Sequence, residues 1–144
     1  MRALLDINVL IALLDSAHVF HRLAVSWWKR EVQHGWASCP ITQNGCIRIM
    51  SHPKYPGTLP IRDVAERLRE AVMGPEHEFW PDDMSLLESD VFDWSRIFSH
   101  RQITDMYLLA LAVRYRGRFV TFDKRISIKA VRGADERHLV RLGS

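Results

Sequence analysis

Residues 103–124, ITDMYLLALAVRYRGRFVTFDK, have the pattern of a helix, a turn and a buried strand, with an aspartate near each end. Apolar residues recur at helical spacing in the first half, at Tyr107, Leu108, Leu111, Ala112 and Tyr115. Gly117 can supply the left-handed residue that ends this helix. Residues 119–122 then form a β-prone run closed by Asp123, as expected of a buried parallel strand. A helix leading into such a strand predicts an α/β sheet.

The N-terminus contains a second strand that ends in an aspartate. Residues 2–6 are short and apolar and end in Asp6, and Asn8 can cap the helix that follows. Taken alone, Asp105 is an ordinary residue of a first helical turn and Asp123 an ordinary turn residue. In open α/β sheets, however, ligands bind beyond the carboxyl ends of the strands. Asp6 and Asp123 are therefore expected side by side, with Asp105 at the start of the neighbouring helix.

Three aspartates gathered in this way predict a metal site. Two carboxylates about 4 Å apart repel each other by roughly 4 kcal/mol at an effective dielectric constant of 20, so a cluster needs a counter-charge. Mg²⁺ or Mn²⁺ supplies one with oxygen ligands, and can activate water to cleave a phosphodiester bond. We therefore expect Asp6, Asp105 and Asp123 to be metal ligands.

The remaining sequence predicts helices on a short, mainly parallel sheet within a single domain of residues 1–144. Amphipathic patterns mark helices at 18–34, from Thr42 to about residue 50, at 61–73 and after Asp83. Further short strands are expected at 36–39, 77–80 and 139–142. Trp27 and Trp28 fit the core better than a base-stacking platform.

Charge is unevenly distributed along the chain. The net charge is only +3, but residues 1–95 carry 9 Lys and Arg against 13 Asp and Glu, whereas residues 96–144 carry 11 against 4. The basic residues around Asp123 suit a polyanion backbone passing the metal site, although a solvated surface without a ligand explains them equally well. They are Arg114, Arg116, Arg118, Lys124, Arg125, Lys129 and Arg132.

Neither a signal peptide nor a membrane span fits the N-terminus, because Asp6 and Asp15 interrupt its apolar residues. We expect a cytoplasmic protein without a membrane partner. Cys39 and Cys46 lack the partners of a zinc site and are expected to be small buried hydrophobes. The absence of GxGxxG, P-loop and HExxH motifs leaves dinucleotide, NTPase and zincin functions without support.

Four segments resemble the PIN domain, specifically the VapC toxins of bacterial toxin–antitoxin pairs. They are LLDINVL around Asp6, HRQITDMYLLALA with Thr104 and Asp105, GRFVTFDKR with Gly117, Arg118, Thr121 and Asp123, and CPITQNGCIRIMSHP. The resemblance covers nearly the whole chain. It implies a three-layer α/β sandwich and a Mg²⁺- or Mn²⁺-dependent endoribonuclease toxin. It also implies a homodimer and an antitoxin that blocks the site.

Carried over onto this sequence, the resemblance assigns the acidic site to Asp6, Asp105 and Asp123 and a supporting hydroxyl to Thr121. Asn8 can orient Asp6, although capping is its simpler role. The family commonly has a glutamate where this chain has Gln43. A neutral amide can orient water or offer one oxygen but adds no negative charge, so the departure favours a one-metal or substrate-completed site.

Two other functions are compatible with the sequence. A PIN-like RNA-binding module with weakened catalysis would explain Gln43 together with the basic C-terminal half. A receiver-like phosphoacceptor domain would explain an aspartate after a strand with Lys124 nearby, but the adjacent acidic pair that such a domain needs after its first strand is missing.

Overall fold

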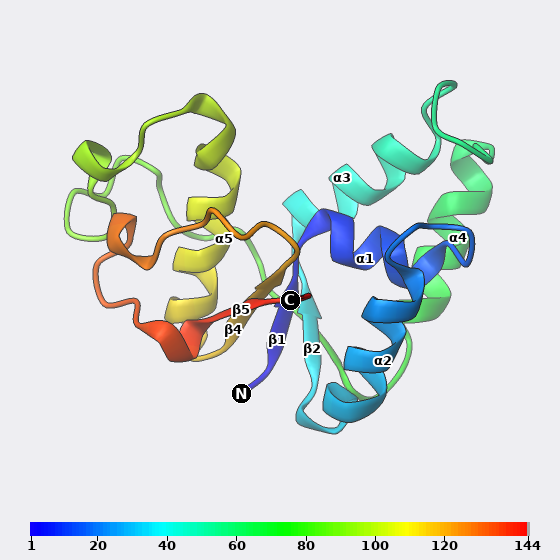
Figure 1. The fold of residues 1–144 in the computed structure, drawn as a ribbon, viewed down its shortest axis with the longest axis horizontal. Helices are drawn as coiled ribbons and strands as arrows, with labels where there is room; N and C mark the ends of the chain where they lie inside the picture. The colour runs from blue at the N-terminus through cyan, green and yellow to red at the C-terminus, as the bar shows by residue number, and fades with distance from the viewer. Residues whose placement is uncertain (144) are drawn as a thin grey trace.

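A parallel β-sheet forms the centre of the computed structural model, which describes residues 1–143 (Figure 1). Within these residues the strands are β1 (Ala3–Leu5), β2 (Trp36–Ser38), β3 (His77–Phe79), β4 (Arg118–Thr121) and β5 (Leu139–Arg141). Their order across the sheet is β3-β2-β1-β4-β5, and every neighbouring pair is parallel. The predicted α/β class is confirmed, and the sheet is wholly parallel.

Helices cover both faces of the sheet (Figure 1). One face carries α1 (Ile7–Leu14), α2 (His21–Glu31), α3 (Pro40–Met50) and α4 (Ile61–Val72), and the other carries α5 (Ile103–Arg114). Short 3₁₀ turns complete the chain: η1 (Val32–His34), η2 (Trp94–Arg96), η3 (His100–Gln102), η4 (Ile128–Ala130) and η5 (Glu136–His138). The arrangement is the expected three-layer sandwich.

Alternation along the central strands divides the core into two. Leu4 and Phe119 pack in the cluster under α5, whereas Leu5 and Val120 pack in the cluster under α1, α3 and α4. This pattern follows from the period of two in a strand whose two faces are both covered. Because Leu5 is in register with Val120, the residues that follow β1 and end β4 lie next to each other.

Several predicted helix boundaries differ from those in the structure. The side chain of Asp6, not that of Asn8, caps α1, and α3 begins at Pro40 rather than after Thr42. Thr42 instead completes a capping box with Cys39. The predicted helix of residues 84–94 is irregular except for η2. Tertiary contacts fix its path, since the hydroxyl of Tyr107 bonds both the N–H and the C=O of Met84.

The turn between α5 and β4 also differs from the prediction. Arg116, not Gly117, adopts the left-handed conformation, with φ of 56°. Gly117 is required by close packing: a Cβ there would lie 2.5 Å from the backbone oxygen of Arg2 and 2.6 Å from Cη2 of Trp80. The glycine thus lets β4 approach β1.

Predictions about buried residues are confirmed. Trp27 is 5% exposed and lies in the core, and Trp28 packs partly buried against it. Cys39 and Cys46 are buried free thiols whose pKa burial raises to about 11 and about 12. Within residues 1–143, no helix combines the length and apolar character needed to cross a membrane.

Candidate active site

Asp6 lies at the carboxyl end of β1, where it leaves the sheet and begins α1. Its backbone N–H donates to Val120 O at 2.9 Å, which continues the β1–β4 pairing. Its Oδ1 accepts from the N–H of Ile7 at 2.8 Å and caps the helix. The residue is only 8% exposed, and this burial raises the pKa of its carboxyl. Asp6 is therefore held rigidly by the backbone of two elements.

Thr121 connects the carboxylates that follow the two strands. Its buried hydroxyl donates to Oδ2 of Asp6 at 2.7 Å and accepts from the backbone N–H of Asp123 at 3.1 Å. The hydroxyl thus fixes the Asp6 carboxylate and the path of the chain leaving β4. The structure thus places the Thr121 hydroxyl, which the resemblance assigned to support the site, between Asp6 and the backbone of Asp123.

Asp105 lies in the first turn of α5, a helix whose next seven residues, from Met106 to Ala112, are all buried. Within residues 1–143 its carboxylate accepts no hydrogen bond. Burial, then the charges of Asp6 and Asp123, raise the pKa of Asp105 to about 7. This coupling places the three carboxylates close enough to repel one another. The charge of Arg125 opposes this rise but does not cancel it.

Asp123 follows β4 and turns toward Arg125. Its Oδ1 accepts from the N–H and Nε of Arg125 at 2.9 and 3.1 Å, whereas its Oδ2 lies 3.4 Å from a terminal guanidinium nitrogen. These bonds lower the pKa of Asp123. The Arg125 side chain is 83% exposed, so the pair is at the surface. One oxygen of Asp123 is tightly held and the other only weakly.

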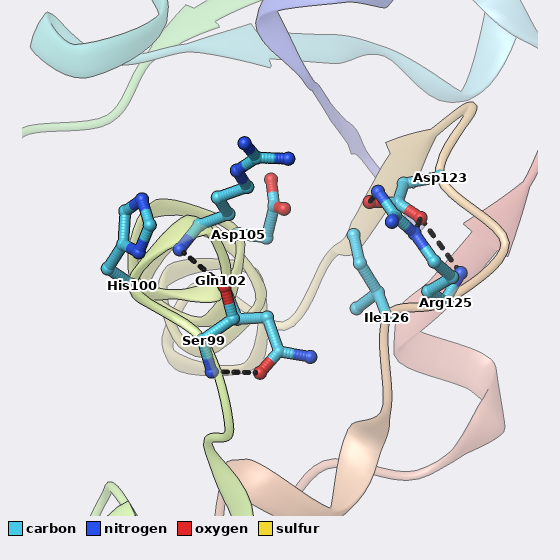
Figure 2. A pocket seen from close by; sticks show the side chains of 8 residues that line it. Ser99, His100, Gln102, Asp105, Asp123, Arg125 and Ile126 are labelled. Atoms are coloured by element: carbon cyan, nitrogen blue, oxygen red, sulfur yellow. Dashed lines mark hydrogen bonds and ion pairs between the residues drawn. The ribbon is translucent and has the colours of Figure 1, made fainter.

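Two cavities meet at Asp105 and Asp123. The smaller, of about 240 Å³, is also lined by Asp6, Asn8 and Thr104. The larger, of about 350 Å³, extends from the same two aspartates to η3. Figure 2 shows Asp105 and Asp123 on opposite sides of this opening, one from α5 and one from the segment after β4. The predicted aspartates therefore converge on one hollow at the carboxyl edge of the sheet.

The donor set suits a hard divalent cation in its chemistry. The cluster offers carboxylate oxygens, and burial, followed by the charges of Asp6 and Asp123, raises the pKa of Asp105. Within residues 1–143, however, no group of three His, Cys, Asp or Glu side chains is already arranged to hold an ion. The bonds between Asp123 and Arg125 account for part of this difference, because they hold one carboxylate toward a guanidinium. The ligand types therefore fit a divalent cation, and changes in side-chain conformation would bring the three carboxylates into a coordinating arrangement.

Comparison with known proteins identifies the family of this chain. The PIN domain family model matches residues 3–132. The chain is 51% identical over 142 residues to Ribonuclease VapC44 of Mycobacterium tuberculosis, covering 99% of this chain and 100% of that protein. The chain belongs to the PIN domain family. It is also 41% identical over 138 residues to Ribonuclease VapC39 of the same species, covering 94% of this chain and 99% of that protein. These relatives place this PIN domain in the VapC branch.

A solved structure shares the PIN fold. VapBC2 from Rickettsia felis, bound to a DNA fragment from its promoter, superposes with a TM-score of 0.65. The match covers 99% of this chain and 100% of that chain at 12% sequence identity. At this identity the similarity supports the architecture alone.

The side chain of Gln43 is hydrogen-bonded to the end of β2. Its Nε2 donates to Oγ of Ser38 at 3.0 Å, and Ser38 in turn bonds Nε2 of His77 at 2.8 Å. Gln43 lines neither of the two cavities. Asn8, by contrast, is exposed and lines the smaller cavity. The Gln43 amide donates to Ser38 of β2, and its role in orienting water at the site stays a prediction.

The predicted basic cluster is divided between the two ends of the sheet. Arg118 begins β4, at the end opposite Asp123, where it pairs with Glu31 and lies 5.8 Å from the Trp27 ring centre. Arg114 pairs with Asp83 near the end of α5. The spacing in sequence was misleading because a strand separates Arg118 from Asp123. Only Arg125 of the predicted set lines the larger cavity.

Sequence reasoning missed the residues that line the larger cavity from η3. Ser99, His100 and Gln102 lie there on the same side as Asp105 (Figure 2), and Arg101 lines the same cavity. They immediately precede the ITD motif, so a polar tetrapeptide before a candidate ligand was the available signal. They line the cavity because the 3₁₀ turn holds them beside Asp105.

Proposed function

We propose that this chain is the ribonuclease toxin of a toxin–antitoxin pair and cleaves RNA phosphodiester bonds with the help of Mg²⁺ or Mn²⁺. The proposal is supported by its full-length similarity to VapC ribonucleases. The observation that carries it is the convergence of Asp6, Asp105 and Asp123 on one hollow, where burial and the other two carboxylates raise the pKa of Asp105. Such a site favours binding of a cation, and the same cation would offset the negative charge of an RNA substrate.

The three aspartates would hold the ion, each in a different way. Asp6 is fixed by Ile7 and Thr121 and supplies a rigid oxygen. Asp105 supplies a carboxylate that burial and its neighbours destabilise as an anion. Asp123 supplies Oδ2, because Arg125 holds mainly Oδ1. A bound Mg²⁺ or Mn²⁺ would contribute the Lewis acidity that activates water and balances charge on the phosphate.

The site carries the charge of three carboxylates because Gln43 is neutral and turned toward Ser38. We propose a one-metal or substrate-completed site on this basis, since a second tightly held divalent ion needs further anionic ligands. Arg101 and Arg125 line the adjoining cavity and can contact the phosphates of a bound strand.

Partners follow from the VapC relationship. We propose a cognate antitoxin that covers the site, a homodimeric toxin and a cytoplasmic location. Size-exclusion chromatography with light scattering, with and without the protein encoded beside this one, would test the first two. A monomer that forms no complex with the neighbouring product would contradict them.

The deciding experiment is cleavage of a total RNA pool by purified protein with Mg²⁺, with Mn²⁺ and with EDTA, alongside Asp105→Asn. We expect discrete metal-dependent products that the variant does not generate. Metal-independent cleavage, or normal cleavage by Asp105→Asn, would overturn the assignment of the site. RNA binding without any cleavage would favour the alternative function, an RNA-binding PIN module with weakened catalysis, which the position of Gln43 supports.

A further inference from the structure

The larger cavity is lined by polar groups that have no role in the proposed cleavage of the phosphodiester bond. Figure 2 shows Ser99 and Gln102, from the start and end of the η3 turn, on one side and Ile126 on the other. Arg101 also lines this cavity. Because the cavity shares Asp105 and Asp123 with the aspartate hollow, an RNA strand at the scissile position would place an adjacent nucleotide here. Its volume of about 350 Å³ lies within the usual range of small-ligand pockets.

Gln102 presents a fixed amide to this cavity. Its Oε1 accepts from the backbone N–H of Phe98 at 2.8 Å and of Ser99 at 3.2 Å. Both partners are N–H donors, so the oxygen must face them and the amide orientation is determined. Nε2 therefore points away from the turn, toward the space bordered by Ile126 (Figure 2). Within residues 1–143 this nitrogen donates to no acceptor.

An amide whose oxygen is occupied is a donor only. It can recognise a hydrogen-bond acceptor on a base edge, and it opposes an exocyclic amine at the same place. Guanine and uracil carry an exocyclic oxygen where adenine and cytosine carry an amine. RNA specificity commonly depends on unpaired bases read in this way. The cavity can therefore select guanine or uracil over adenine or cytosine.

The neighbouring groups suit a nucleotide rather than a small anion or an apolar ligand. Arg101 forms no ion pair within residues 1–143 and lines the cavity with a free positive charge. Ile126 is a largely buried residue of the core under α5, and it contributes a small apolar surface to the cavity wall. A cation, an apolar surface and one oriented donor match the phosphate, the base face and the base edge of a nucleotide.

Building on the proposed ribonuclease function, we propose that this cavity is a base-selective subsite. In it, Gln102 Nε2 donates to the exocyclic oxygen of a guanine or uracil next to the cleaved bond. Gln102 is then a specificity residue of the toxin, as well as the residue that caps η3.

A purely structural role for Gln102 makes a different prediction. Glutamate serves equally well at this position of a capping box, because one carboxylate oxygen accepts the same backbone N–H groups. Gln102→Glu therefore keeps the turn while replacing the cavity-facing donor with an acceptor. If capping were the only role, base preference would not change.

The test compares wild type, Gln102→Glu and Gln33→Glu on an RNA library randomised around one unpaired segment, with Mn²⁺, and sequences the cleaved ends. Gln33 lies exposed in η1, before β2 at the opposite end of the strands, and is a matched control for the chemical change. The readout is the ratio of bases at each position beside the cut. This ratio cancels any uniform loss caused by the added charge.

We expect wild type and Gln33→Glu to favour guanine or uracil at one position by about tenfold, and Gln102→Glu to shift toward adenine or cytosine there. Thermal melting of Gln102→Glu should stay near that of wild type, because the cap is retained. Active cleavage with the same base ratios in Gln102→Glu would overturn the subsite while leaving the ribonuclease proposal intact. No cleavage by wild type would overturn both.

Discussion

The hydroxyl of Thr121 donates a 2.7 Å hydrogen bond to Oδ2 of Asp6, which joins the last residue of β4 to the residue that follows β1. Both side chains are buried, so water cannot replace this bond. The same hydroxyl accepts from the N–H of Asp123, which couples the position of a second carboxylate to the first. The two strands thereby bring their aspartates to the site as one unit.

Replacing Thr121 with valine should lower activity more than it lowers stability. The change preserves shape but leaves Asp6 Oδ2 without its donor, and loss of such a supporting bond typically costs about 10- to 100-fold in metal affinity or activity. The free energy of unfolding should fall by about 1–3 kcal/mol. Mn²⁺ titration and cleavage rates measure the first effect. Thr121→Ser retains the hydroxyl and should stay close to wild type; an equal loss in both variants would show that packing, not the bond, matters.

Asp105 should make the metal-free protein less stable as pH rises. Its pKa is raised from 3.8 to about 7 in the folded protein, so its contribution is fully present below pH 3.8 and is lost as pH rises through about 7. In EDTA, Asp105→Asn should therefore melt above wild type by about 3 °C or more at about pH 8, and level with it at about pH 3.5. Added Mn²⁺ should reverse the order at pH 8 by stabilising only the wild type. Identical pH profiles of the two proteins in EDTA would contradict this account.

Gln43→Glu should strengthen metal binding if the negative charge of only three carboxylates limits the number of divalent ions that the site binds. We expect tighter Mn²⁺ binding and a second bound equivalent by calorimetry, because added negative charge and an oxygen ligand favour a second ion. Gln33→Glu adds the same charge far from the site and should change neither value. Unchanged affinity and stoichiometry in Gln43→Glu would mean that its position beside Ser38, not its neutrality, keeps residue 43 out of the site.

Arg101→Ala and Arg125→Ala should weaken RNA binding without unfolding the protein. Both side chains are exposed and line the larger cavity, so each should reduce the slope of log K against log salt by about 1. The pair of Arg125 with Asp123 is at the surface and should contribute little to stability. Arg114→Ala, at a surface pair near the other end of α5, is the control and should leave the salt slope unchanged. A reduced slope in the control would relocate the RNA path.

Gly117→Ala should destabilise the fold. The new Cβ would lie 2.5 Å from Arg2 O, a backbone atom that also accepts the N–H of Arg118, so neither strand can move freely. We expect a loss of about 2 kcal/mol or more in the free energy of unfolding, measured by urea denaturation. Gly74→Ala meets only the flexible end of Glu76 at 3.2 Å and should cost much less. Equal effects at both positions would contradict the close approach of β1 and β4.

The sequence by itself determined the sheet, its parallel strands and the three aspartates. Apolar runs at residues 3–5 and 119–122, each followed by an aspartate, were sufficient because parallel strands present their carboxyl ends at one edge. The burial of α5 was equally clear, since its apolar residues extend without a break from Met106 to Val113. Local patterns of this kind carry their own structural signal.

Tertiary structure alone decided how the side chains around those aspartates are used. Gln43 bonds Ser38, a residue of a neighbouring strand, and Arg118 lies a full strand away from Asp123 despite their proximity in sequence. Gln102 becomes an oriented donor only because a 3₁₀ turn brings Phe98 and Ser99 to its oxygen. These roles depend on contacts between elements, and periodicity within one element contains no information about them.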